Sequence, residues 1–260
     1  MHEREGEALG LRYVYRRIDL DELKLDATAL PTLLNAAQQL GFNGLNITYP
    51  CKQAVIPLLD ELAESARDIG AVNTVVLENG RKFGHNTDCL GFAEGFRRRL
   101  GDVARDRVVQ LGAGGAGAAV AHALLSEGIG LLEIHDLDPE RAARLVARLT
   151  RHFGAGRAKM LDALPSTLAS ADGLVNTTPV GMLKMPGMPL PRRLLRADLW
   201  VAEIIYFPLQ TELLRQARAL GCRTLDGGMM AVFQAVKSFE LFTGFKPDAD
   251  RMLAHFKSLL

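Results

Sequence analysis

A glycine-rich turn is the stretch of this sequence whose residue types and spacing point most directly to a chemistry. Residues 108–111 form a short apolar run typical of a buried strand, and Gly112, Gly114 and Gly117 follow at once. In this spacing the first glycine permits a tight turn, the second lets backbone approach a pyrophosphate, and the third lets a helix pack on the strand. Residues 118–126 have helical composition, and the N-terminus of such a helix offers N–H groups to phosphates. The pattern therefore predicts a dinucleotide site made of Gly112, Ala113, Gly114, Gly115, Ala116 and Gly117.

An acidic residue at the end of the next expected strand adds to this prediction. Residues 131–135 are strand-like and lead into Asp136, at the distance expected of the acid that binds the adenosine ribose. A carboxylate there accepts hydrogen bonds from both ribose hydroxyls and repels a 2′-phosphate. Arg141 lies a few residues further on and would offset part of that repulsion. The sequence thus favours NAD over NADP as the cofactor.

Composition limits the classes of protein to consider. The 260 residues, 48% of them hydrophobic and 23% charged, suffice for two domains with a sizeable core. The net charge of +1 argues against a nucleic-acid partner. The three cysteines fit no metal-ligand spacing, and we expect them to be thiols in a reducing cytoplasm. No apolar run would span a membrane, and the charged start is unlike a signal peptide. A small molecule is therefore the expected partner, while homo-oligomerisation is left open.

The order of the expected elements predicts an α/β protein with two domains. Strand-like and helix-like segments alternate between residues 101 and 228, which is typical of a doubly wound parallel sheet with helices on both faces. Residues 73–78 and 81–85 read as a hairpin around Asn79-Gly80, a strong turn dipeptide. We further expect strands over residues 12–18 and 44–48, and helices over 1–9, 21–40, 51–62, 66–70, 88–100, 229–242 and 248–260.

Seven segments, in the same order along nearly the whole chain, resemble those of the shikimate/quinate dehydrogenases. One match would be chance, whereas seven collinear matches are specific. Within the family the chain most resembles the NAD-preferring quinate/shikimate branch of actinobacterial type. The segments are residues 46–52, 70–74, 84–88, 112–117, 176–182, 206–211 and 227–234.

The resemblance implies two domains, one for the substrate and one for the cofactor. Residues 1–100 and 229–260 would form the substrate domain, to which the last helices return, and residues 101–228 a Rossmann domain for NAD. Substrate and nicotinamide would meet in the cleft between the domains. The reaction would be reversible hydride transfer between NAD and a ring carbon that bears a secondary hydroxyl. It would interconvert quinate or shikimate and 3-dehydroquinate or 3-dehydroshikimate.

The resemblance places Lys52 and Asp88 beside the reacting hydroxyl. Oxidation of an alcohol releases a proton as well as a hydride, so a group must take that proton. A lysine does so only where burial or cationic neighbours favour its neutral form, whereas a nearby Asp88 would hold it charged. The sequence leaves open whether Lys52 is a true base or a charged donor that steadies the alkoxide.

The same resemblance assigns further residues to the substrate and the cofactor. A polyhydroxy acid needs donors and acceptors at fixed places, because an unpaired buried polar group is costly. Each position also has an ordinary structural interpretation, and paired methionines are commonly core residues. His85, Cys51 and Cys89 neighbour the site in sequence but receive no catalytic role. Assigned to the substrate are Thr48, Asn73, Tyr206 and Gln234, and to the cofactor Thr177, Val180, Met182 and Met230.

Two other functions deserve comparison. A folate-linked dehydrogenase also has two domains and a lysine in its cleft, but the segments at residues 86–88 and around Gln234 argue against it. A binding module for NAD or for quinate and shikimate, with reduced or lost turnover, would keep the pocket; intact Lys52 and Asp88 argue against that alternative. The preference between quinate and shikimate is left open.

The first residues depart from the family pattern. In the family, a strand and a Ser-x-Ser or Ser-x-Thr turn that holds the substrate carboxylate precede the helix that begins here at Met1. We therefore expect the substrate domain to lack its first strand, which would lie between residues 12–18 and 44–48. We also expect the 260-residue chain to bind NAD better than quinate or shikimate.

Overall fold

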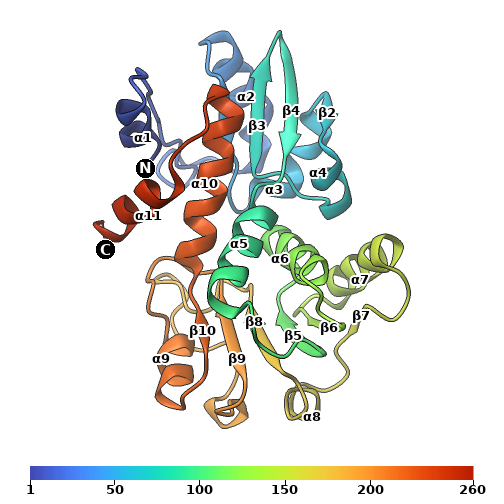
Figure 1. The fold of residues 1–260 in the computed structure, drawn as a ribbon. Coiled ribbons are helices and arrows are strands. Elements are labelled where there is room, and N and C mark those ends of the chain that lie inside the picture. The colour runs from blue at the N-terminus through green and yellow to red at the C-terminus, as the bar shows by residue number, and fades with distance from the viewer. Residues whose placement is uncertain (260) are drawn as a thin grey trace. The chain divides into compact units, whose positions relative to one another are not determined.

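The computed structural model describes residues 1–259, which form two compact units (Figure 1). Unit 1 comprises Met1–Thr87 and Val232–Leu260, and unit 2 comprises Asp88–Ala231. Helix α10 (Gly227–Thr243) continues from unit 2 into unit 1. No helix of the described residues is long and apolar enough to cross a membrane.

Unit 1 is built on a four-stranded sheet in the order β1-β3-β4-β2. Its strands are β1 (Gly44–Asn46), β2 (Glu61–Leu62), β3 (Thr74–Glu78) and β4 (Arg81–His85). The β3–β4 hairpin confirms the prediction around Asn79-Gly80, whose φ angles of 50° and 76° suit the tight two-residue turn. Strands β1 and β3 are antiparallel, while β2 pairs with β4 in parallel.

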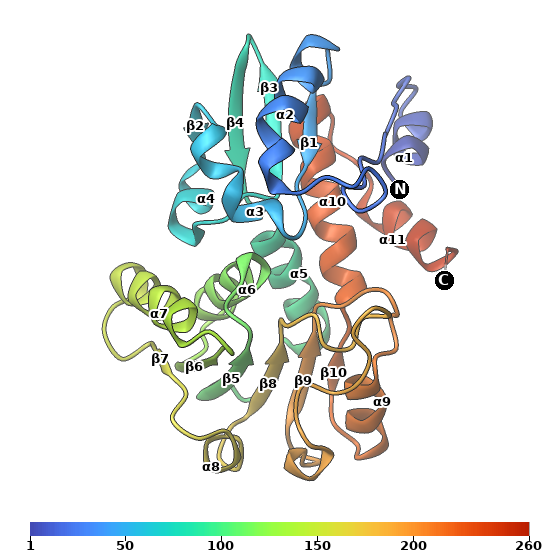
Figure 2. The same ribbon diagram turned by 180° about the vertical axis from the view of Figure 1, so that it is seen from behind.

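Several short helices belong to unit 1, and Figure 2 shows α2 on one face of the sheet. An apolar cluster that includes Leu34, Val55 and Val75 joins helix to sheet. The pair formed by Glu5 and Arg251, with Nη2 to Oε1 at 2.6 Å, links the first helix of unit 1 to the last. The helices are α1 (His2–Ala8), α2 (Leu30–Gln39), α3 (Cys51–Ala54), α4 (Glu64–Ile69) and α11 (Ala249–Lys257), with 3-10 turns η1 (Ala27–Ala29) and η2 (Ile56–Leu58).

Two of the helices expected in unit 1 are shorter than predicted. The segment before α2 is broken by Lys24, with φ of 56°, and by Asp26, whose side chain accepts a hydrogen bond from the Thr28 N–H at 2.8 Å. An aspartate used in this way favours a turn over a continuing helix. The helix predicted over residues 51–62 ends at Ala54, and the chain continues through η2 into β2.

The strand predicted over residues 12–18 is wrong, because these residues form neither a strand nor a helix. Their aromatic side chains stack instead of supporting backbone pairing. The Tyr13 ring lies 5.2 Å from the Phe239 ring and the Tyr15 ring 4.9 Å from that of His2, centroid to centroid. Burial lowers the pKa of His2 to about 4, so a neutral imidazole occupies this stack at pH 7.

Unit 2 contains a six-stranded, all-parallel sheet in the order β10-β9-β8-β5-β6-β7. The chain starts at β5, builds outward through β6 and β7, and returns to build the other half from β8. This confirms the predicted doubly wound sheet, with its switch of direction between β5 and β8. The strands are β5 (Arg107–Leu111), β6 (Leu131–His135), β7 (Ala158–Met160), β8 (Gly173–Asn176), β9 (Trp200–Glu203) and β10 (Thr224–Leu225).

The helices of unit 2 bury apolar faces against this sheet. Leu213 and Leu214 join a core cluster with Leu174 and Val201 of the strands. Strands β8 and β9 are buried at every residue, as expected of parallel strands covered on both faces. The helices are α5 (Asp88–Leu100), α6 (Gly115–Ser126), α7 (Pro139–Phe153), α8 (Leu164–Leu168) and α9 (Glu212–Ala219), with a 3-10 turn η3 (Arg192–Leu194).

The division between units falls before α5, whereas the sequence suggested residue 100. Packing explains the difference. The fully buried Phe96 of α5 meets the Trp200 ring edge-on at 5.4 Å, and the Trp200 indole N–H donates to the Ala104 carbonyl at 2.9 Å. These contacts join α5 to the sheet of unit 2.

Removal of the Phe96 ring should destabilise unit 2. Phe96→Ala leaves a cavity beside Trp200, and such substitutions cost about 3–5 kcal/mol. Trp200 is the only tryptophan of the chain, so its fluorescence during urea unfolding reports on unit 2. Leu90→Ala, at a position of the same helix that is 52% exposed, is the control and should change the midpoint little. Equal midpoints for the two variants would contradict this account of α5.

Candidate active site

The glycine turn between β5 and α6 has the shape of a phosphate cradle. A Cβ atom at Gly112, where φ is +99°, would lie 2.7 Å from Thr177 Oγ1, and one at Gly117 would lie 2.6 Å from the Gly112 carbonyl oxygen. A Cβ at Gly114 would meet no atom within 4 Å. Gly112 and Gly117 are therefore required by packing, while Gly114 leaves space open beside the backbone. The residues present fit a pyrophosphate group.

The start of α6 adds the electrostatic part of this cradle. Gly114 is the cap residue, has no side chain, and accepts the first helical hydrogen bond from the Ala118 N–H at 2.8 Å. Helix geometry leaves the N–H groups of residues 115–117 without acceptors inside the helix. Together with the positive end of the helix dipole, these groups favour an anion.

Two buried side chains hold the turn in place. Gln110 donates from Nε2 to the carbonyl oxygens of Gly112 and Gly117, each at 2.9 Å. The Thr177 hydroxyl lies 2.8 Å from the Leu111 carbonyl oxygen and 2.9 Å from that of Gly112. Thr177 was expected near the cofactor, whereas Gln110 was missed. Its signal was a polar side chain inside the otherwise apolar run of residues 108–111, where a partner is required.

Asp136 lies beside the same turn. Its Oδ2 accepts a hydrogen bond from the Ala113 N–H at 2.7 Å, and its Oδ1 accepts one from the Asp138 N–H at 2.9 Å. Arg141 Nη1 is 3.6 Å from Oδ1. Asp136 follows Ala113 by 23 residues in the sequence, and Arg141 lies further on. The structure brings both to the turn, at the carboxyl end of the sheet. Ligands of doubly wound sheets bind at this edge.

The loops after β8 and β9 carry the remaining residues assigned to unit 2. Val180 and Met182 follow Thr177, and the Asn176 amide donates to the Val180 carbonyl oxygen at 3.1 Å. Tyr206 follows β9 and is 53% exposed, and Met230 is buried on α10. The glycine turn contacts Thr177, while Met182, Tyr206 and Met230 lie on three separate segments of the unit.

The residues assigned to unit 1 gather at one end of its sheet. The Val72 N–H donates to the Lys52 carbonyl oxygen at 2.8 Å, and the Cys51 N–H donates to that of Thr48 at 2.8 Å. The Ile47 N–H donates to the Asn73 carbonyl oxygen at 2.7 Å. Thr48, Lys52 and Asn73 therefore stand on segments joined by backbone hydrogen bonds. Gln234 is half-buried on α10, in the part that belongs to this unit.

Asn73 is fixed by Thr87, a residue that the sequence analysis did not single out. Asn73 Nδ2 donates to Thr87 Oγ1 at 2.9 Å, and the Thr87 N–H donates to Asn73 Oδ1 at 2.7 Å. Both side chains are buried. This exchange sets the orientation of the Asn73 amide and leaves its second N–H hydrogen for another acceptor.

Asp88 directly follows Thr87 and is the first residue of α5. Its side chain is only 4% exposed, which is unusual for a carboxylate. The positive end of a 13-residue helix stabilises a negative charge at this place. By the contacts that define the units, Asp88 belongs to unit 2 and Lys52 to unit 1.

The neighbouring histidine and cysteines have features of structural residues. Burial, and secondly the charge of Lys237, lowers the pKa of His85. Burial raises the pKa of Cys89 to about 12, with smaller contributions from Asp88 and Glu127, and burial also raises that of Cys51. Thiols that stay protonated at neutral pH are poor nucleophiles. This agrees with the expectation that neither cysteine acts as one.

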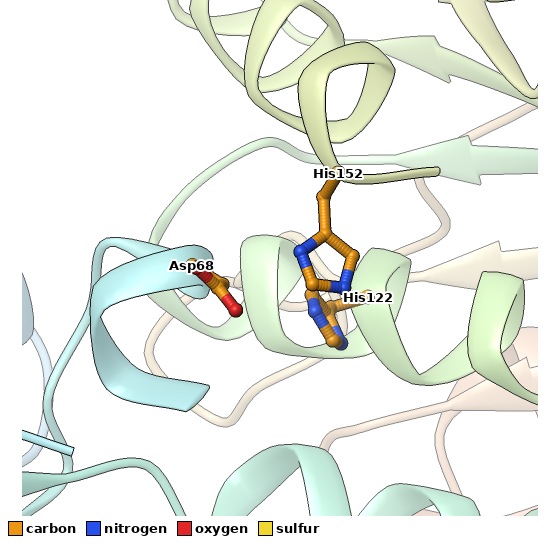
Figure 3. A group of neighbouring side chains, drawn as sticks. All are labelled: Asp68, His122 and His152. Atoms are coloured by element: carbon orange, nitrogen blue, oxygen red, sulfur yellow. The ribbon is translucent and has the colours of Figure 1, made fainter. Parts of the chain in front are cut away.

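A pair of histidines in unit 2 was not foreseen from the sequence. The His122 ring on α6 and the His152 ring on α7 lie 4.8 Å apart, centroid to centroid (Figure 3). Cys89 Sγ is 3.8 Å from His122 Nδ1, but its raised pKa makes it a poor metal ligand. Zinc sites use three or four protein ligands, so this pair does not by itself form a metal centre. Figure 3 also labels Asp68, which lies on α4 of unit 1.

A surface cavity of unit 1 is lined by none of the predicted site residues. It has a volume of about 690 Å³ and is lined by residues of α1, of the segment that follows it and of α11, among them Arg4, Tyr13 and His255. Because its lining includes none of the residues assigned to the cofactor or the substrate, the candidate residues are those of the glycine turn in unit 2 and of the cluster around Asn73 in unit 1.

A doubly wound parallel sheet with this turn and a following acid is typical of dinucleotide-binding domains of Rossmann type. Comparison with known proteins then gives the family. Residues 1–75 match the model of the shikimate dehydrogenase substrate binding domain, and residues 230–255 match that of the shikimate 5'-dehydrogenase C-terminal domain.

Similar proteins cover the whole chain. A shikimate dehydrogenase (NADP(+)) of Streptomyces avermitilis is 60% identical over 100% of this chain and 90% of its own. A quinate/shikimate dehydrogenase (NAD(+)) of Corynebacterium efficiens is 51% identical over 100% and 92%. The structure of quinate dehydrogenase from Corynebacterium glutamicum in complex with NAD superposes with a TM-score of 0.90, at 49% identity over 99% and 92% of the two chains.

The chain therefore belongs to the shikimate/quinate dehydrogenase family of oxidoreductases, which confirms the resemblance. The names of these relatives are divided between NADP and NAD. A choice between the two nucleotides must therefore rest on the residues around Asp136.

The geometry of the turn predicts different effects for two glycine substitutions. Gly117→Ala forces a Cβ against the Gly112 carbonyl oxygen, and overpacking of this kind costs about 1–3 kcal/mol. Gly114→Ala meets open space but places a poorer cap residue at the start of α6, so it should cost about 1 kcal/mol at most and less than Gly117→Ala. Urea unfolding followed by Trp200 fluorescence compares them. A Gly114→Ala variant that is the less stable of the two would refute this account of the turn.

Proposed function

We propose that the protein catalyses the NAD-dependent, reversible oxidation of a secondary hydroxyl on a ring acid. Its substrates are quinate or shikimate, and its products 3-dehydroquinate or 3-dehydroshikimate. The observation that carries the proposal is the Asp136 carboxylate, bonded at 2.7 Å to the Ala113 N–H of the glycine turn. The printed names of the relatives support the class of substrate.

The charges around Asp136 favour NAD. Each oxygen of this carboxylate accepts one backbone hydrogen bond and keeps a lone pair for a ribose hydroxyl. Arg141 is shared between Asp136, at 3.6 Å, and Asp138, at 3.8 Å. Arg144 is likewise shared between Asp138 and Glu140. These three carboxylates and two guanidinium groups leave a net negative charge around Asp136. This charge disfavours binding of the 2′-phosphate of NADP.

The residues assigned to the cofactor and to the substrate bind and orient the two reactants. NAD, when bound, supplies the hydride acceptor. The glycine turn and the start of α6 bind its pyrophosphate, and Asp136 orients its adenosine ribose. On the substrate side, the second N–H of Asn73 donates to a ring hydroxyl, and Thr48 and Gln234 complete the recognition of the hydroxyl groups. We assign transfer of the hydroxyl proton to Lys52 and Asp88, on the family resemblance.

Substitution of Asp136 should change the nucleotide preference. Asp136→Ser removes the repulsive charge and should lower the ratio of kcat/KM for NAD to that for NADP by at least about tenfold, or about 1.4 kcal/mol. Steady-state rates of reduced-nucleotide formation with quinate and with shikimate provide the measurement. Asp162→Ser, at an exposed aspartate of the same unit, is the control and should leave the ratio unchanged. A wild-type kcat/KM for NADP that equals or exceeds that for NAD would refute the proposed preference for NAD.

Lys52→Ala and Asp88→Asn should separate turnover from nucleotide binding. Each should lower kcat/KM by roughly 10²–10⁴-fold, the usual contribution of a proton-transfer group. NAD affinity, measured by calorimetric titration, should stay near that of the wild type, because the glycine turn and Asp136 are untouched. Lys246→Ala, at an exposed lysine of unit 1, is the control. A Lys52→Ala variant with a near-normal rate would remove Lys52 from the mechanism.

A further inference from the structure

Glu203 is a buried acid to which the proposed reaction assigns no role. It is the last residue of β9, and only 1% of its surface is exposed. Its Oε1 accepts hydrogen bonds from the Ile204 N–H at 3.0 Å and the Ile205 N–H at 3.3 Å. Asn176 Nδ2 lies 3.1 Å from both carboxyl oxygens, and Thr211 Oγ1 donates to Oε2 at 3.3 Å. A buried carboxylate surrounded only by neutral donors is costly, so such a residue calls for an explanation.

The first arm of this network reaches the loop after β8. Asn176 stands opposite Glu203 in the register of the parallel pair β8–β9. Its amide also donates to the Val180 carbonyl oxygen at 3.1 Å, while its Oδ1 accepts from the N–H and the hydroxyl of Thr178 at 3.0 and 2.7 Å. The Val180 N–H in turn donates to Thr178 Oγ1 at 3.2 Å. The conformation of this loop therefore depends on the orientation of one amide, which Glu203 holds.

A second set of hydrogen bonds to the Glu203 carboxyl group holds both ends of the loop after β9. The N–H groups of Ile204 and Ile205 bind the carboxyl where the loop begins. Thr211 binds it where the loop ends, and also caps α9 by accepting from the Leu214 N–H at 3.3 Å. Tyr206 lies between these two anchor points. A single carboxyl group thus connects the two loops that carry Val180, Met182 and Tyr206.

We infer that Glu203 is a positioning residue of the nucleotide site, whose ionised carboxylate holds the loops after β8 and β9 in the conformation that binds NAD. The inference rests on the proposed function, because these loops carry residues that the family resemblance assigns to the cofactor, Val180 and Met182, and to the substrate, Tyr206. Glu203 acts through Asn176 and Thr211 and touches neither reactant.

The pKa of Glu203 lies near neutral pH. Burial raises the pKa of Glu203 to about 7, although the hydrogen bonds from Asn176, Ile205, Thr211 and Ile204 oppose this rise. The groups that contact the carboxyl from β8, from the loop after β9 and from the start of α9 are an amide, two backbone N–H groups and a hydroxyl, and none of them titrates near neutral pH. Protonation converts one carboxyl oxygen into a donor, so a bond from Asn176 or Thr211 is lost or reversed. NAD affinity should therefore fall as the pH drops below about 7.

Stability should respond in the opposite direction. The pKa of Glu203 is higher in the folded chain than its ordinary value of 4.5. Protonated Glu203 therefore contributes stability that is fully present below pH 4.5 and is lost as the pH rises through about 7. Glu203→Gln is neutral at every pH, and its amide can donate to Thr211 and accept from Asn176. Above pH 7 this variant should unfold at the same temperature as the wild type or at a higher one, while it binds NAD less tightly.

The test compares wild type, Glu203→Gln and the control Glu212→Gln, which changes a glutamate directly after Thr211 at the start of α9. Calorimetric titration with NAD from about pH 6 to pH 8 should show wild-type affinity falling below about pH 7. Glu203→Gln should bind on the order of tenfold more weakly at pH 8, without that pH dependence. The control should behave as the wild type does. Hydrogen exchange should be faster in Glu203→Gln at residues 177–182 and 204–211.

Other results would contradict either the positioning role of Glu203 or the proposed function. If Glu203→Gln binds NAD as tightly as the wild type with the same pH dependence, Glu203 does not position the site. If it is less stable at pH 8 with unchanged NAD affinity, its role is structural only. If the wild type binds NAD at no pH, the proposed function fails and this inference falls with it.

Discussion

The close approach of the Gly112 backbone to Thr177 is the constraint on which the nucleotide-binding unit depends. A Cβ at Gly112 would lie 2.7 Å from the Thr177 hydroxyl, which itself bonds the carbonyl oxygens at the end of β5. The turn after β5 and the loop after β8 can therefore meet only if position 112 has no side chain. This contact sits where the sheet changes direction, and it brings the start of α6, Asp136 and the loop after β8 to one edge.

Buried polar side chains organise this edge of the sheet. Gln110 holds the turn after β5, Asn176 holds the loop after β8, and Glu203 joins that loop to the one after β9. All three stand in strands whose other residues are mostly apolar and buried. A polar group in such surroundings must find partners, and here the partners are backbone groups of the loops. Unit 1 uses the same device, with Asn73 held by Thr87.

Local patterns in the sequence predicted a large part of the fold. The strand over residues 131–135 and the helix over residues 88–100 were predicted with their observed bounds, because apolar runs and helical periods are local properties. The hairpin followed from Asn79-Gly80, whose positive φ angles few other residues tolerate. The strand expected over residues 12–18 failed because a β-prone composition cannot tell which neighbour a segment will meet; these aromatic residues meet His2 and Phe239.

The sequence by itself determined the cradle and its acid, since the spacing of Gly112, Gly114 and Gly117 and the position of Asp136 are set along the chain. Only the tertiary structure decided which residues support them. Glu203 lies 27 residues from Asn176, and Gln110 reaches Gly117 across the turn. No spacing rule joins such residues, because their contacts arise when parallel strands align in register and their carboxyl ends meet. The energy of a buried carboxyl group is likewise a property of its surroundings, which exist only after the sheet has formed.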